Sequence, residues 1–183
     1  SAGTLRMSHP QSFGVPGAAY ALTVGDGASL VFDGMNGDIT VPANYTPVSI
    51  RGAGNTLVGP ISGALVNMSG TNTVMGAITM PAATYIASPA GKLTLSGDIT
   101  GSFALTVFGE GDTELDGVLG TAAGTLGKYG SGTLTLGGSG SNSFTGITTV
   151  NGGAILLAKS ANSAINSGAV TVNNGGILRY AAA

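Results

Sequence analysis

The stretch Gly132-Thr133-Leu134-Thr135-Leu136 decides the fold of this chain, because its pattern returns along the sequence at a nearly constant spacing. It is a glycine followed by alternating polar and apolar residues, which is typical of a β-strand with one buried face. Further copies of the pattern begin at Gly70, where it is weaker, and at Gly91, Gly111, Gly153 and Gly176. A period of about 21 residues made only of strands is too short for a propeller blade or a helical repeat and predicts the coils of a β-solenoid.

The alternation also predicts which side chains point inward. Successive side chains of a strand lie on opposite faces, so Leu134 and Leu136 belong to the core and Thr133 and Thr135 to the solvent. We expect Leu95, Leu115, Leu136 and Leu157 to stack in one internal column, since they occupy the same position in successive copies. Six other alternating segments supply the remaining strands of the coils: 39–41, 64–66, 77–80, 103–107, 147–150 and 169–172.

Composition agrees with short strands joined by tight turns. The chain has 183 residues, 33 of them Gly, no Cys, and only 8% charged residues, against about a quarter in an ordinary globular protein. The net charge of -2 comes with no cluster of Lys and Arg, which argues against a nucleic-acid partner and against a polybasic membrane contact. No apolar segment is long enough for a transmembrane helix.

The repeat divides the chain into a flanking segment and a single domain. Residues 1–25 lack the repeat and are rich in Pro and aromatic residues, so we interpret them as an N-terminal cap or flank. Residues 26–183 form the solenoid coils, in which 158–166 is the best place for a helical turn or a looped-out bulge. Because the repeat runs to the last residues, we expect a fragment of a longer protein that is prone to associate end to end.

Residues 126–153 carry a specific resemblance. The sequence LGKYGSGTLTLGG at 126–138, followed by NSFTGITTVNGG at 142–153, closely resembles the autotransporter-associated β-strand repeat. The match is specific over 126–157, degenerate over 91–117 and 165–180, and only compositional before that.

The resemblance implies an all-β fold, a right-handed parallel β-helix (β-solenoid) with about 21 residues per coil. It also implies a passenger segment of a secreted bacterial autotransporter-like protein, extracellular at the cell surface and held to the membrane only through a C-terminal anchor that this chain lacks. Such passenger domains are typically adhesins or structural stalks. Their partners would be host or surface glycans and proteins.

The acidic residues Glu110, Asp112, Glu114 and Asp116 are the only cluster of carboxylates, and they alternate along one strand. They are the weak candidates for a metal site, since Ca²⁺ takes six to eight oxygen ligands and a loosely held Ca²⁺ is the one cofactor that these residues suggest. A solvated acidic face is the simpler interpretation, because Ser131, Thr133, Thr135 and Gly137 hold the same positions in the next coil.

The sequence assigns no catalytic residue. His9 has no carboxylate, Cys or second His near it in sequence and is expected on the surface. Lys92, Lys128 and Lys159 fall on different coils and are expected to be exposed charges that keep sheet edges apart. We therefore predict a structural or adhesive solenoid that is not an enzyme, with a carbohydrate-binding or polysaccharide-active β-helix as the alternative.

Overall fold

The computed structural model describes residues 3–13, 19–55, 62–160, 163–173 and 175–181, and its strands form three parallel sheets. Sheet A contains β1 (Thr4–Met7), β3 (Ser29–Asp33), β6 (Leu65–Ser69), β9 (Thr84–Ala87), β12 (Leu105–Phe108), β15 (Leu126–Tyr129), β17 (Thr148–Val150) and β19 (Val170–Val172). Sheet C contains β4 (Thr40–Val41), β7 (Thr71–Val74), β10 (Lys92–Leu95), β13 (Asp112–Leu115), β16 (Thr133–Leu136), β18 (Gly153–Leu157) and β20 (Gly176–Tyr180). Sheet B contains β2 (Tyr20–Val24), β5 (Tyr45–Ile50), β8 (Ile78–Met80), β11 (Ile99–Gly101) and β14 (Leu119–Gly120).

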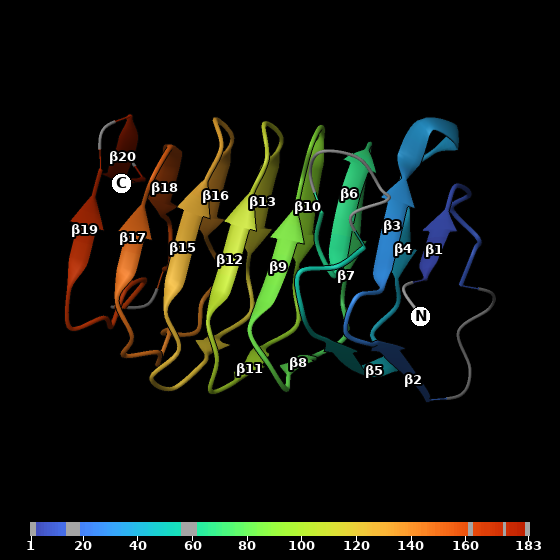
Figure 1. The fold of residues 1–183 in the computed structure, drawn as a ribbon, viewed down its shortest axis with the longest axis horizontal. Coiled ribbons are helices and arrows are strands. Elements are labelled where there is room, and N and C mark those ends of the chain that lie inside the picture. Colours follow the sequence, from blue (N-terminus) through green and yellow to red (C-terminus); the bar gives the residue numbers. More distant parts are fainter. Residues whose placement is uncertain (1–2, 14–18, 56–61, 161–162, 174, 182–183) are drawn as a thin grey trace.

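The chain winds through the three sheets in the order A, C, B and then begins the next coil. In Figure 1 sheet A faces the viewer, sheet C lies behind it and sheet B closes the bottom of the rod. The front strands run upward, the chain returns behind them, and the coils advance from the N-terminus on the right to the C-terminus on the left. This path is a right-handed parallel β-solenoid of about eight coils, as the sequence predicts.

The predicted leucine column is confirmed. Leu95 pairs with Leu115, Leu115 with Leu136 and Leu136 with Leu157 in sheet C, and all four side chains are buried. Thr135, between the two leucines of β16, faces outward and is partly exposed. The core is a continuous apolar cluster that runs the length of the rod.

The register step in sheet A is constant in the middle of the rod. Leu65 pairs with Ile86, Thr84 with Leu105 and Leu105 with Leu126, each a step of 21 residues. A constant step keeps each inward side chain above the corresponding one of the preceding coil. This is why the repeat is readable from the sequence in this part of the chain.

The first coils are longer than the repeat predicts. Leu30 pairs with Leu65, a step of 35 residues, and Thr4 pairs with Ser29, a step of 25 residues. Part of the extra length of the second coil is the short 3-10 helix η1 (Gly34–Asn36) between β3 and β4. The segment 1–25 contributes β1 and β2, which pair with β3 and β5, so this flank is continuous with sheets A and B.

The described part of the chain has no helix other than η1, and no helix that is long and apolar enough to cross a membrane. Within 158–166, where we expected a helical turn or a bulge, the described residues 158–160 and 163–166 contain no strand and no helix. The chain there forms a long connection between β18 and β19. Residues 161 and 162 of this segment lie outside the described residues.

Repeated glycines before strands of sheet C lie where two coils approach closely. A Cβ atom at Gly132 would lie 2.1 Å from the carbonyl oxygen of Gly111 in the preceding coil. At Gly91 the backbone also has a φ of +72°, and a Cβ would lie 2.2 Å from the oxygen of Gly70. The glycine column of the sequence is therefore required by coil stacking and not only by turn geometry.

Candidate functional site

The acidic cluster lies on the outer face of sheet C, on and beside β13. Glu110 and Asp112 are exposed, and Glu114 and Asp116 are partly buried. Asp112 Oδ1 accepts a hydrogen bond from the backbone N–H of Thr133 at 2.8 Å, and Glu114 forms an ion pair with Lys92 at 2.5 Å. Two of the four carboxylates therefore already have protein partners.

Asp116 lies at the end of the cluster, just after β13. Burial raises its pKa above the usual value, and the neighbouring carboxylate of Glu114 adds to the rise. In the described residues no group of three or more His, Cys, Asp or Glu side chains is arranged to hold a metal ion. The residues that could hold a cation remain Glu110, Asp112, Glu114 and Asp116, and weak Ca²⁺ binding there stays a prediction.

Asp112 is one of three aspartates whose side chains link one coil to the next. Each of the three accepts a hydrogen bond from a backbone N–H of the following coil. These are Asp38 with Thr71 at 2.7 Å, Asp98 with Val118 at 2.8 Å, and Asp112 with Thr133 at 2.8 Å. Sequence reasoning missed this role, although the position of each aspartate at the start of a strand or just before it is a signal for it.

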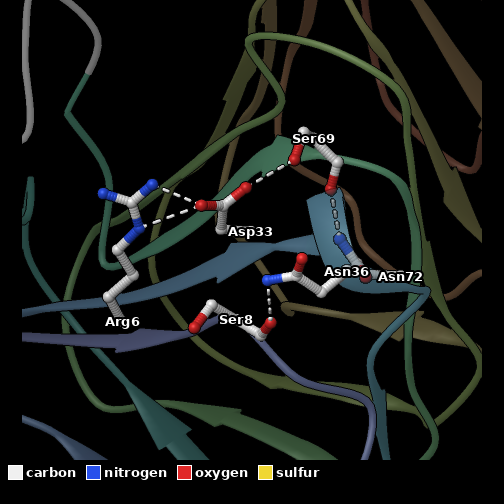
Figure 2. A network of polar contacts seen from close by, with 6 residues as sticks. All are labelled: Arg6, Ser8, Asp33, Asn36, Ser69 and Asn72. Atoms are coloured by element: carbon white, nitrogen blue, oxygen red, sulfur yellow. Dashed lines mark hydrogen bonds and ion pairs between the residues drawn. The ribbon is translucent and has the colours of Figure 1, made fainter.

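A polar network joins the second coil to its neighbours (Figure 2). The guanidinium of Arg6 donates to Asp33 Oδ2, and the hydroxyl of Ser69 donates to Asp33 Oδ1 at 2.7 Å. These contacts hold the pKa of Asp33 below its usual value, with Ser69 contributing most. The carboxylate therefore stabilises the fold above its unfolded pKa, and this contribution is lost as the pH falls through its lower, folded pKa.

Two fully buried asparagines continue the network into the corner between sheets A and C. Asn72 Nδ2 donates to the backbone oxygen of Ser69 at 2.7 Å, and Asn72 Oδ1 accepts from the backbone N–H of Ile39 at 2.6 Å. Asn67 in turn donates to Ser88 Oγ at 3.1 Å. Each of these contacts pairs a buried polar group with a partner inside the protein, so the network stabilises the stack of coils.

Lys128 is buried, and our expectation that it is an exposed edge charge is wrong. Its side chain is only 1% exposed, in the inward column of sheet A between Val107 and Val150. The ammonium Nζ donates to the backbone oxygens of Tyr129 at 2.7 Å and Gly130 at 2.9 Å. The methylene chain of Lys128 lies in the core, and its ammonium group hydrogen-bonds to the backbone of the bend that follows β15.

The other two lysines also have defined partners. Lys159 Nζ donates to the backbone oxygens of Asp116 at 3.2 Å and Gly117 at 2.8 Å, and burial lowers its pKa. Lys92 forms the ion pair with Glu114 on the surface, which raises its pKa. Lys92, whose side chain is 45% exposed, fits the surface role expected from the sequence.

The buried lysine predicts an unusual dependence of stability on pH. Burial lowers the pKa of Lys128 from 10.5 to about 8, so between these two pH values the unfolded chain binds a proton that the folded chain does not. The free energy of unfolding should therefore rise by about 3 kcal/mol from pH 8 to pH 10.5 through this residue, and stay level below pH 8. Urea unfolding of the wild type and of Lys128→Met across this range measures the difference.

The matched control is Lys92→Met, which removes a lysine from the surface. Its pKa is raised, so its contribution is fully present below the unfolded pKa and is lost only at higher pH. This variant should keep the rise between pH 8 and 10.5. An equal rise in the Lys128→Met protein would contradict the assignment.

A groove lies on the outer face of sheet A. Its volume is about 670 Å³, and Tyr85, Phe108 and Tyr129 from three successive strands line it. The rings of Tyr85 and Phe108 meet edge to face, with centroids 5.8 Å apart. Sequence reasoning missed this groove, although the recurrence of an aromatic residue followed by Gly at 108–109 and 129–130 is a signal that could have found it.

His9 is exposed, as expected, and its Nδ1 accepts a hydrogen bond from the backbone N–H of Gln11 at 3.2 Å. The structure brings together the acidic residues of β13 with Lys92, and it brings together the aromatic residues of sheet A. It does not bring His9 to either group.

A scan against protein-family models, a search of curated proteins and a search of solved structures each found no match to this chain.

Proposed function

We propose that this chain is a structural or adhesive segment of an extracellular bacterial surface protein, related to the autotransporter-associated repeat, and that it catalyses no reaction. The observation that carries the proposal is the in-register stack of coils, in which every strand of sheet A pairs in parallel with the next along the rod. Such a stack repeats equivalent surface positions at a fixed spacing along the rod, and an extended regular surface of this kind is suited to a stalk or to adhesion.

The placement of the ionisable groups supports a non-catalytic role. Catalysis needs acids and bases that converge on one reacting position. Four of the ionisable groups form hydrogen bonds within their own coil or to a neighbouring coil, and each stabilises the stack of coils. They belong to Asp33, Asp112, Lys128 and Lys159. End-to-end association of copies and a glycan or protein partner are parts of the same proposal.

The location is tested by labelling cells of the source bacterium with an antibody raised against the purified chain. We expect intact cells to be labelled as strongly as permeabilised cells, because the segment is displayed outside. Labelling that appears only after permeabilisation would contradict the proposal. An antibody against a cytoplasmic protein of the same cells serves as the control for intactness.

The alternative, a polysaccharide-active β-helix, has its own test. The purified chain is incubated with polysaccharides, and new reducing ends are measured. Cleavage that disappears when Glu110, Asp112, Glu114 and Asp116 are changed to their amides would replace the structural function with an enzymatic one.

A further inference from the structure

We propose that the groove over β9, β12 and β15 binds a neutral, linear glycan laid along the rod axis. In an adhesive solenoid such a site would make the contact with the target surface, so its biological role rests on the function proposed above. The binding itself is argued from the groove alone.

Two of the three aromatic rings of the groove, those of Phe108 and Tyr129, lie in register along the rod, and Tyr85 is offset by two residues along β9. Tyr85, Phe108 and Tyr129 come from neighbouring strands of sheet A, and neighbouring strands lie about 4.8 Å apart. This spacing is close to the length of one pyranose unit in a linear polysaccharide. Aromatic faces offer the apolar surface on which the C–H faces of a pyranose ring can pack.

The rings are held in place by their surroundings. Phe108 packs against the small apolar cluster of Val31, Val66 and Ala87 on the outer face of sheet A. Tyr129 lies against Gly127, where an added Cβ would come 3.3 Å from the ring. Below Tyr129, the ammonium of Lys128 fixes the bend through the carbonyl oxygens of residues 129 and 130. A preformed site of this kind loses little conformational entropy when a ligand binds.

Polar groups with unused hydrogen-bonding capacity surround the rings. The lining includes the hydroxyls of Tyr85, Thr106, Tyr129 and Ser131 and the carboxylate of Glu110. Within the described residues the structure records no side-chain hydrogen bond or ion pair for these five groups. Hydroxyl donors and a carboxylate acceptor beside apolar rings match the mixed surface of a sugar, which has C–H faces and a rim of hydroxyls.

The charged residues around the groove favour a neutral glycan over a charged ligand. The residues that line the groove include one carboxylate and no Lys, Arg or His, which disfavours nucleic acid, sulfated glycans and other polyanions. A cationic ligand is disfavoured as well, because the ammonium of Lys128 lies directly beneath the bend that carries Tyr129 and Gly130. The volume of about 670 Å³ falls in the usual range of ligand sites and exceeds that of a single small ion.

The test titrates the purified chain with three hexasaccharides, of β-1,4-linked glucose, β-1,4-linked N-acetylglucosamine and α-1,4-linked glucose, and with tetramethylammonium as a cationic probe. Isothermal titration calorimetry and saturation-transfer NMR report binding. We expect at least one hexasaccharide to bind, and Tyr129→Ala and Tyr85→Ala each to weaken that binding about tenfold or more. Both side chains are substantially exposed, so neither change should alter the unfolding midpoint.

Tyr180→Ala is the matched control, because Tyr180 is an exposed tyrosine on β20, away from the groove. It should bind like the wild type. Three results would overturn the proposal: no hexasaccharide binds at millimolar concentration, the two groove variants bind as well as Tyr180→Ala, or only tetramethylammonium binds. Failure of cell labelling with intact glycan binding would reject the surface function and leave the site standing, so the two proposals can be told apart.

Discussion

Replacing Gly132 with alanine is expected to lower the free energy of unfolding by about 3 kcal/mol or more, the upper end of what one inserted methyl group costs. The new Cβ would lie 2.1 Å from the carbonyl oxygen of Gly111 and 2.9 Å from that of Glu110. Both atoms belong to the backbone of the preceding coil, so no side chain can move aside. The coils must separate locally, which lengthens the hydrogen bonds between β13 and β16. Urea unfolding followed by far-UV circular dichroism measures the loss.

Gly25→Ala is the matched control for this variant. No atom lies within 4 Å of the position that its Cβ would occupy, and its φ is not in the left-handed region. Its stability should remain within about 0.5 kcal/mol of the wild type. If both variants lost the same amount, the close approach of the coils would not be the reason for the glycine column.

Truncating Leu115 to alanine is expected to cost about 3 to 5 kcal/mol, because it opens a cavity in the middle of the core. Leu115 is 1% exposed and pairs with Leu95 on one side and Leu136 on the other. The backbones of both neighbouring coils are fixed by their own sheets, so the cavity cannot collapse. The measurement is again equilibrium unfolding in urea.

Two controls separate cavity formation from a general effect of losing a side chain. Thr135→Ala removes an outward side chain of β16 and should cost less than about 1 kcal/mol. Leu157→Ala, in the same column but 8% exposed, should cost less than Leu115→Ala, about 2 kcal/mol, since its coil has more freedom to relax. Equal losses for Leu115→Ala and Thr135→Ala would contradict the inward column.

The sequence predicts the middle of the rod well because one physical rule governs it. From β6 onward each inward residue must lie above another at a step of about 21 residues, so Leu95, Leu115 and Leu136 were identified without a structure. In the first coils the number of residues per coil is not fixed in this way. The connections between strands are longer there, and the register shifts between Phe32 and Asp33 where β3 pairs with β6.

The site residues were harder to predict because they depend on distances between coils. The charge of Lys128 gave no sign that its side chain points inward, since only the bend beside it provides the two carbonyl acceptors. The carboxylate of Asp112 suggested a cation ligand, but the nearest partner is an amide N–H one coil away. In both cases the partner is a backbone group, which the residue types alone do not reveal.

The aspartates that bond to the following coil give the rod a direction of growth. Asp38, Asp98 and Asp112 each hold an acceptor at the edge that the next coil will occupy, and each bond is made only when Thr71, Val118 or Thr133 arrives. A finished coil thus presents an ordered template to the segment that follows it in the chain. A polypeptide that emerges N-terminus first can add coils one at a time on this template.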